Sequence, residues 1–147
     1  MKHLSLLLLL IGGIGISTYA QFRGPIDPPT ILKENFERDF PDASSSNATW
    51  WEETNHYVVT FMQNSYSMRG FYSRTGKWVY TEIKVPHSLL KQKLFQHLDK
   101  NYPGFSIQES ILHDEKGNNF YQIHINWRGG PVKLQFQEDG TFIKKMN

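Results

Sequence analysis

The histidines are the side chains in this sequence with the most obvious capacity for chemistry. His113 and His124 could approach each other across a hairpin of residues 105–127, and Asp114 or Glu115 could add a carboxylate oxygen. Such a group would bind a transition metal weakly. No histidine belongs to an HExxH motif or to another closely spaced pair. The simpler interpretation is two surface imidazoles beside a turn, so we expect no metal site.

Four further stretches contain reactive side chains without the pattern that chemistry requires. The turn at 114–119 lacks the alternating oxygen ligands and closing glutamate of an EF-hand. The serines at 44–46 are not in a GxSxG elbow, and Gly76-Lys77 lacks a glycine-rich phosphate cradle. Glu52 and Glu53 are adjacent, so on a strand they point to opposite faces. The chain has no cysteine, which excludes thiolate chemistry. We therefore expect a protein that is not an enzyme and has no cofactor.

The first twenty residues have the pattern of a secretory signal peptide. Lys2 and His3 precede an apolar segment, residues 4–16, and Ala20 supplies a small residue before the expected cleavage site. The apolar run is shorter than the roughly 20 residues that a membrane-spanning helix needs. Cleavage would leave a chain that begins at Gln21, in the periplasm or secreted. The absence of cysteine argues against a lipid anchor.

The composition predicts one ordinary domain. Removing 20 residues from 147 leaves 127, a size that buries enough surface to fold without disulfides. The formal net charge of the whole chain is +2, and no run of lysine or arginine indicates a nucleic-acid partner. The aromatic content of 14% favours a sheet-rich domain.

Two segments have the spacing of a short amphipathic helix that ends at a proline. The first, residues 31–40, places Leu32 and Phe36 four positions apart and stops at Pro41. The second begins at Pro86, stops at Pro103, and has an apolar stripe made of Leu90, Leu94, Phe95, Leu98 and Tyr102.

Each helix is followed by strands and a hairpin of one design. Residues 67–81, SMRGFYSRTGKWVYT, and residues 131–145, PVKLQFQEDGTFIKK, both contain a strand, a polar turn closed by glycine, an aromatic residue two positions later and a second strand. Matching positions are 64 residues apart: Val59 and Ile123, Phe61 and Ile125, Tyr72 and Phe136, Gly76 and Gly140, Trp78 and Phe142. This regularity predicts an internal duplication.

The expected fold class is therefore α+β. After an extended leader, residues 21–30, a single domain would consist of two repeats, residues 31–83 and 86–147, each with a helix and several strands. Short turns make the sheet antiparallel, and the helices should cover one face of it.

These segments resemble the PepSY-like family of beta-lactamase-inhibitor-like exported bacterial proteins. The resemblance covers most of residues 33–145. It is carried by Phe-x3-Phe-Pro at 36–41, Tyr-x-Val-x-Phe at 57–61, Gly-Lys-Trp at 76–78, FYQIHI at 120–125 and LQFQEDGTF at 134–142. It implies a duplicated fold like that of beta-lactamase inhibitor protein, in an envelope or secreted protein of a Gram-negative bacterium.

Strand alternation assigns the strand residues to two faces of the sheet. The face toward the helices should carry the core residues Tyr57, Val59, Phe61, Tyr121, Ile123, Ile125, Val132, Leu134 and Phe136. The other face is polar in the second repeat and more apolar in the first. We predict a binding site on that face, formed by Trp51, Val58, Met62, Arg69 and Phe71. The alternative is that the leader or a loop covers these side chains.

The leading functional hypothesis is an exported, non-enzymatic binding module. It would hold an unidentified envelope protein or peptide on its open sheet face, and the resemblance adds inhibition of an envelope hydrolase or peptidase. The alternative is a small-ligand or metal carrier of the cell envelope that uses His113 and His124. We expect no nucleic-acid partner, and no membrane association after signal cleavage.

Overall fold

A computed structural model describes residues 24–43 and 47–146, so the predicted signal peptide, residues 21–23 of the leader and the serines at 44–46 lie outside the described residues. The elements follow in this order: α1 (Thr30–Asp39), β1 (Thr49–Glu52), β2 (His56–Gln63), β3 (Tyr66–Ser73), β4 (Trp78–Lys84), the 3-10 helix η2 (His87–Leu89), α2 (Gln92–Asn101), β5 (Ser106–Asp114), β6 (Phe120–Trp127), β7 (Gly130–Gln137) and β8 (Phe142–Met146).

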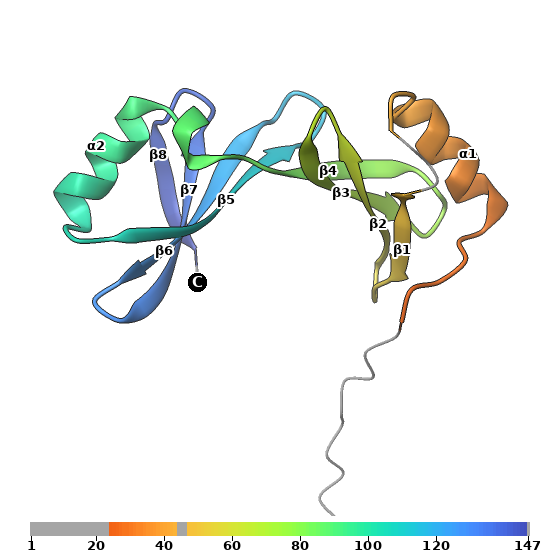
Figure 1. Cartoon of the computed structure of the whole chain (residues 1–147), viewed down its shortest axis with the longest axis horizontal. Coiled ribbons are helices and arrows are strands. Elements are labelled where there is room, and N and C mark those ends of the chain that lie inside the picture. The colour runs from red at the N-terminus through yellow and green to blue at the C-terminus, as the bar shows by residue number, and fades with distance from the viewer. Residues whose placement is uncertain (1–23, 44–46, 147) are drawn as a thin grey trace, which may run out of the picture.

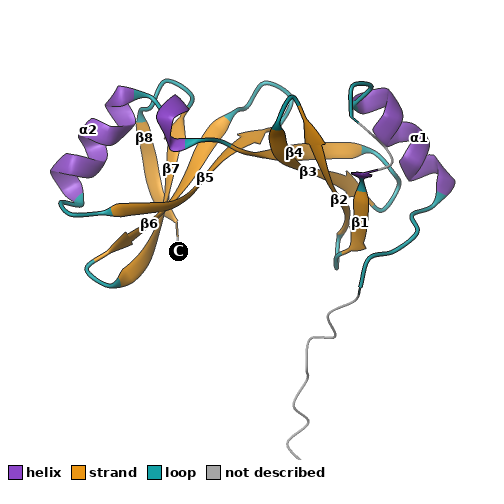
Figure 2. Ribbon diagram, in the orientation of Figure 1, coloured by secondary structure: helices purple, strands orange, loops and turns teal. Residues whose placement is uncertain are grey.

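The strands form one antiparallel sheet of eight strands, and their order in space is their order in the sequence. Figure 1 shows the sheet bending between its two ends, with α1 outside one end and α2 outside the other. Figure 2 shows that neither α1 nor α2 lies over the middle of the sheet. The predicted α+β fold with a single antiparallel sheet is confirmed.

Each helix covers a hydrophobic core of its own. The buried core under α1 contains Leu32, Phe36, Trp50, Val59, Phe61 and Tyr72. The buried core under α2 includes Leu94, Leu98, Ile123, Ile125, Leu134 and Phe136. Strand register places Val59 and Ile123 on the same face of the sheet, so both helices cover that face. Each large apolar side chain that is fully buried contributes roughly 1.5–3 kcal/mol to stability.

The hairpin turns of the two halves have the same backbone conformation. The β2–β3 turn uses Asn64 and Ser65 with φ angles of 50° and 67°, and the β6–β7 turn uses Arg128 and Gly129 with 51° and 78°. Positive φ at both central residues matches the twist of the flanking strands in a tight hairpin. The wider turns also correspond, because the amide N–H of Ser73 and that of Gln137 each donate to the carbonyl four residues later at 2.8 Å.

The equivalence extends to irregularities in the strands. The pairing of β3 with β4 shifts register between Phe71 and Tyr72, and the pairing of β7 with β8 shifts between Gln135 and Phe136. These two positions are 64 residues apart. A bulge at the same place in each hairpin re-aims the side chains that follow it. The two halves therefore share local geometry as well as element order.

Two local features differ from the simplest expectation. The helix predicted to begin at Pro86 begins only at Gln92, because Leu90 and Lys91 are extended, with ψ angles of 148° and 139°. This extended segment lets Leu90 enter the core beneath α2. The described part of the leader packs on the helix side of the sheet, where the amide N–H of Ile26 donates to the carbonyl oxygen of Trp50 at 2.9 Å.

We predict that Gly140→Ala destabilises the protein more than Gly117→Ala. Both glycines have positive φ, 88° and 90°, so alanine is strained at each by about 1–2 kcal/mol. A Cβ at Gly140 would also lie 3.0 Å from the backbone nitrogen of Leu94 and 3.0 Å from Cβ of Lys91, whereas a Cβ at Gly117 meets nothing within 4 Å.

Urea denaturation of the two variants measures the difference, since Gly117→Ala controls for backbone strain alone. Equal losses of stability would contradict the close contact between the β7–β8 turn and the start of α2.

Candidate binding face

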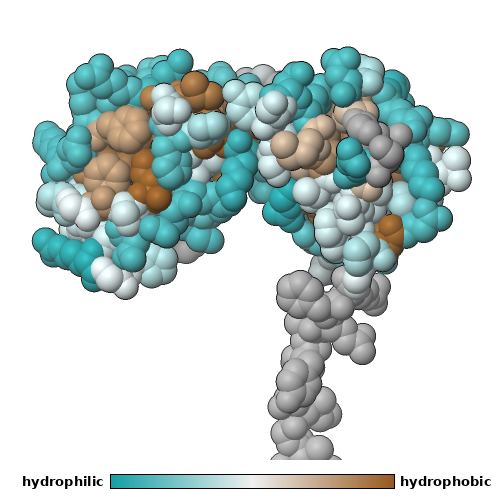
Figure 3. All heavy atoms as spheres, in the orientation of Figure 1, coloured by the Kyte–Doolittle hydropathy of each residue, from teal (hydrophilic) through white to brown (hydrophobic). Residues whose placement is uncertain are grey.

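We call the sheet face opposite the two helices the open face. Its side chains form rows that cross the strands. One row runs through Arg69 of β3, Glu82 of β4, His113 of β5 and Phe120 of β6. In the space-filling view of Figure 3, the visible surface of both halves is largely hydrophilic, with apolar side chains in smaller areas.

Four rings are stacked across the middle of the open face. The ring centroids of Phe71 and Tyr80 are 4.2 Å apart, those of Tyr80 and His113 4.3 Å, and those of His113 and Phe120 4.5 Å. The rings are near parallel, with interplanar angles of 18°, 22° and 13°. We call these residues the ring stack. It crosses from β3 to β6 and therefore joins the two halves of the sheet.

The ring stack changes the prediction of an exposed apolar patch. Val58 is 1% exposed and Phe71 is 4% exposed, so the expectation that they lie open to a partner is wrong. Val58 lies between Trp51 and Phe71 on neighbouring strands, and the Arg69 guanidinium lies 4.9 Å from the centroid of the Phe71 ring. Side chains of the sheet itself cover these two residues.

Three of the predicted binding residues remain accessible. Met62 is 51% exposed, Arg69 is exposed and Trp51 is half-buried. Trp50, its neighbour in β1, points the other way and belongs to the core under α1. The role of the predicted residues in binding stays a prediction, now centred on Trp51, Met62 and Arg69.

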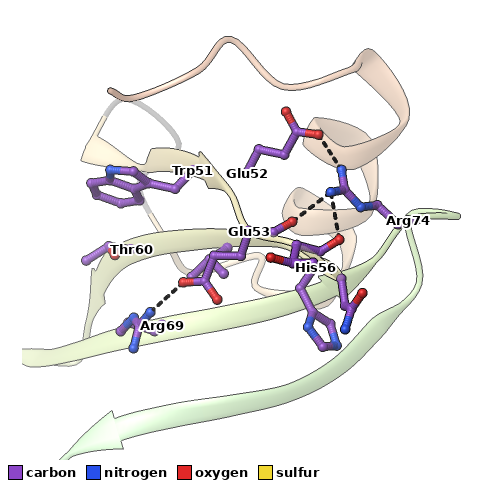
Figure 4. A pocket seen from close by; sticks show the side chains of 10 residues that line it. Trp51, Glu52, Glu53, His56, Thr60, Arg69 and Arg74 are labelled. Atoms are coloured by element: carbon purple, nitrogen blue, oxygen red, sulfur yellow. Dashed lines mark hydrogen bonds and ion pairs between the residues drawn. The ribbon is translucent and has the colours of Figure 1, made fainter. Parts of the chain in front are cut away.

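A hollow of about 1100 Å³ lies on the open face of the first half. Its lining includes Trp51, Glu53, His56, Val58, Thr60 and Arg69. Figure 4 shows Trp51 and Thr60 on one side of it, the Glu53–Arg69 pair in the middle and Arg74 on the other side. The hollow therefore combines an apolar wall with a charged floor.

Two arginines form ion pairs with three glutamates in this region. Arg69 contacts the Glu53 carboxylate at 3.2 Å and the Glu82 carboxylate at 3.1 Å. Arg74 pairs with Glu52 and donates to the carbonyl oxygen of Glu53 at 2.7 Å, which connects the β1–β2 turn to the β3–β4 turn. Such exposed pairs stabilise a fold by only about 0–1 kcal/mol each. Their main effect is to give the hollow fixed donors and acceptors without net charge.

The ring stack is uncharged at neutral pH. Burial raises the pKa of Tyr80 to about 12, and the nearby Glu82 carboxylate adds to the rise. Burial lowers the pKa of His113, although Glu82, Glu115 and Asp114 favour its protonated form. Nδ1 of His113 is buried and has no hydrogen-bond partner among the described residues. Protonation of His113 would therefore place an unsolvated charge between two rings.

The structure separates the two histidines that could have formed a metal site. His113 is opposite Phe120, whereas His124 is opposite Glu109 and its Nδ1 lies 3.3 Å from that carboxylate. Phe120 and His124 are four residues apart on one strand, which corresponds to about 13 Å. Among the described residues, no group of three or more His, Asp or Glu side chains could hold a metal ion.

Sequence reasoning missed the ring stack. Tyr80, His113 and Phe120 each have the correct alternation for the open face, so their orientation could have been inferred from the sequence. Their contact depends on the pairing of β4 with β5, in which Glu82 is opposite His113. That register joins segments from different halves, and no short turn between them fixes it.

The chain matches the model of a protein family described as "Putative beta-lactamase-inhibitor-like, PepSY-like" over residues 55–144. The match covers more than half of the chain. The chain belongs to this family. No curated protein sequence matches the chain. None of the helices within the described residues has the length and apolar character that a membrane crossing requires.

Solved structures from Bacteroides share the fold of this PepSY-like chain. A BLIP-like protein from Bacteroides fragilis is 14% identical, with a TM-score of 0.72, covering 82% of this chain and 86% of its own. A DUF2874 family protein from Bacteroides uniformis is 14% identical, with a TM-score of 0.73 and coverages of 82% and 90%. A protein from Bacteroides eggerthii described as "putative periplasmic" is 13% identical, with a TM-score of 0.73 and coverages of 83% and 90%.

We predict that acid destabilises the protein partly through His113. In the unfolded chain histidine titrates near pH 6.5, whereas the pKa of His113 in the folded protein is lowered by burial. Between these two pKa values the unfolded state binds more protons, so stability falls as pH decreases below about 6.5. Each such group contributes a slope of at most about 1.4 kcal/mol per pH unit.

Urea denaturation of the wild type and of His113→Phe at several pH values between 7.5 and 5 measures this slope. We expect a shallower slope in the variant. Part of the pH dependence that remains in the variant should come from His97, whose pKa is also lowered, by burial and by the Lys100 charge. An unchanged slope would contradict the buried, neutral state of His113.

Proposed function

We propose that the protein is an exported, non-enzymatic binding module that holds a protein or peptide of the cell envelope on its open face. Export is supported by the signal-peptide pattern of residues 1–20 and by the periplasmic description of a structural relative. The family description supports a binding role, and inhibition of an envelope hydrolase or peptidase is its most specific form. A shared fold does not by itself establish a shared target.

The observation that carries this proposal is the hollow beside the ring stack. It lies on a sheet face that the helices leave free, and it is large enough for one or more side chains of a partner. Trp51 offers apolar area and Arg69 offers a planar cation, and these two residue types often dominate binding energy at protein interfaces. Exposed Met62 adds an adaptable apolar contact near the end of β2.

The second half of the open face lacks the residues for the same apolar contact. Gln122, Gln135 and Asn126 stand 64 residues after Val58, Phe71 and Met62, and Lys133 is exposed. The two halves share their local geometry but differ in the chemistry of this face. We infer that the halves, residues 31–83 and 86–147, derive from a duplication and that the first half has kept or acquired the contact surface.

No observation favours the alternative of a metal carrier. His113 is occupied by ring contacts on both sides, and His124 is paired with Glu109. The hollow contains His56, but its carboxylates contact arginines. The proposed function therefore does not involve a bound metal.

Site-specific photocrosslinking in the native envelope tests the proposed function. A photoreactive residue at Met62, which is 51% exposed, should crosslink one discrete envelope protein. The same residue at Leu89, which is 52% exposed and lies in η2 away from the open face, is the matched control and should not crosslink that protein. Added purified wild-type protein should compete for the crosslink.

The competition experiment distinguishes binding at a specific site from nonspecific adsorption. Purified Trp51→Ala should compete at least about tenfold less well, because an aromatic hot-spot side chain typically contributes 2 kcal/mol or more. Circular dichroism and urea denaturation must show that Trp51→Ala is folded. Equal crosslinking from Met62 and Leu89, or equal competition by the folded variant, would overturn the open-face proposal.

A further inference from the structure

The two edges of the sheet are not equivalent. At the β1 edge, Ile26 of the leader forms an isolated antiparallel bridge to Trp50. At the other edge, β8 pairs only with β7 within the described residues. An edge strand presents unpaired N–H and C=O groups that can bind another extended chain. The β8 edge is therefore the free edge of the described sheet.

β8 is the counterpart of β4 in the first half. Each follows a turn closed by a positive-φ glycine, Gly76 or Gly140, and each pairs with its hairpin partner through the same register shift. β4 does not end the sheet, because β5 pairs with its other side. The molecule thus contains one example of a strand added to this kind of edge, at Thr81–Lys84, just beyond the bulge.

The pairing of β5 with β4 shows what kind of side chains an added strand can carry at such an edge. β5 is antiparallel to β4, and Thr81 is opposite Asp114. Lys84 lies 3.4 Å from the carboxylate of Glu109, so a charge pair reinforces the backbone ladder. The incoming strand thus carries acidic side chains, one of them paired with a basic residue of the accepting strand.

The β8 edge carries two lysines that have no acidic ion-pair partner among the described residues. Lys144 and Lys145 are exposed, and neither forms an ion pair within the described part of the chain. The position equivalent to Thr81, 64 residues later, is Lys145. A strand added in the register of β5 would therefore place its aspartate opposite a lysine. Ile143, 43% exposed, adds apolar surface at the same edge.

The same lysines act against self-association. Two β8 edges brought together would place lysines near lysines, and edge lysines are a common means of preventing such pairing. The β1 edge of a second copy is already bridged by Ile26. A second copy is therefore a poor occupant of the β8 edge, whereas a strand bearing carboxylates matches its charge.

We propose that β8 binds an extended acidic segment of a partner protein by antiparallel strand addition along its free edge. Backbone hydrogen bonds to the edge would supply affinity, and carboxylates facing Lys144 and Lys145 would supply preference. This site is separate from the hollow on the open face, and it does not depend on the function proposed for that face.

The chain itself supplies the probe. A capped peptide with the β5 sequence SIQESILHD contains two carboxylates, and its last four residues, Ile111–Asp114, pair with the equivalent strand β4. With isotope-labelled full-length mature protein, we expect the peptide to slow hydrogen exchange at alternate amides between Phe142 and Met146 and to shift their NMR signals. Binding should weaken at high salt because the charges are exposed.

Three comparisons decide the result. The Lys144→Glu/Lys145→Glu variant should bind the peptide about tenfold more weakly, since it makes the edge that the acidic peptide contacts negative instead of positive. Lys77→Glu/Lys100→Glu, with the same charge change at exposed positions outside β8, should bind as the wild type does. A peptide N-methylated at alternate residues keeps its charge but cannot extend the ladder, and should not protect the β8 amides.

The proposal is overturned by protection confined to other strands, by equal binding of the N-methylated peptide, or by equal binding of a charge-reversed peptide, SIQKSILHK. Peptide-free dimerisation with protected β8 amides would also overturn it, because the occupant would then be a second copy. The N-methylated and charge-reversed peptides are tested on the wild-type protein, so these two results do not depend on the folding of a variant.

Discussion

The structure depends on one constraint: a sheet of eight strands has helices on only one face, and they cover only its two ends. The two helix-covered cores are separate groups of residues. Between them, the sheet must hold itself together through the β4–β5 ladder and through side chains of the open face. The ring stack supplies the second contribution, because Phe71, Tyr80, His113 and Phe120 bury one another where no helix can do so.

This arrangement determines what the open face can offer to a partner. The stacked rings turn their faces toward each other, so the middle of the sheet presents ring edges rather than a flat apolar patch. The hollow lies toward β1 and β2, where Trp51 forms one wall and ion pairs order the floor. Recognition on this face therefore combines a hollow in the first half with a polar surface in the second.

Local patterns predicted the parts of the fold that local chemistry determines. Pro41 and Pro103 end their segments close to the observed ends of α1 and α2, and Gly76 and Gly140 have the positive φ that their turns require. Alternation placed Val59 and Ile123 correctly in the cores because a strand exposes successive side chains to opposite faces.

The burial of Phe71 and the neighbours of His113 could not be predicted in the same way. The neighbours of His113 depend on the register between β4 and β5, which belong to different halves. The burial of Phe71 depends on the pairing of β3 with β4, where a bulge shifts the register at Phe71. A one-residue change in such a register moves every side chain to the other face. The alternation rule also says nothing about how strongly a sheet bends, so it could not reveal the hollow beside Trp51.

A double-mutant cycle on Tyr80 and His113 tests most directly whether the ring stack joins the two halves. The free energies of unfolding of the wild type, Tyr80→Ala, His113→Ala and the double variant would be measured in urea at pH 7.5, where His113 is neutral. If the ring stack joins the two halves, the coupling free energy between Tyr80 and His113 should be favourable by about 0.5–1.5 kcal/mol, the range found for stacked rings. If the losses of unfolding free energy were additive, with a coupling near zero, the contact between Tyr80 and His113 would not stabilise the fold. That result would contradict a ring stack that joins the two halves.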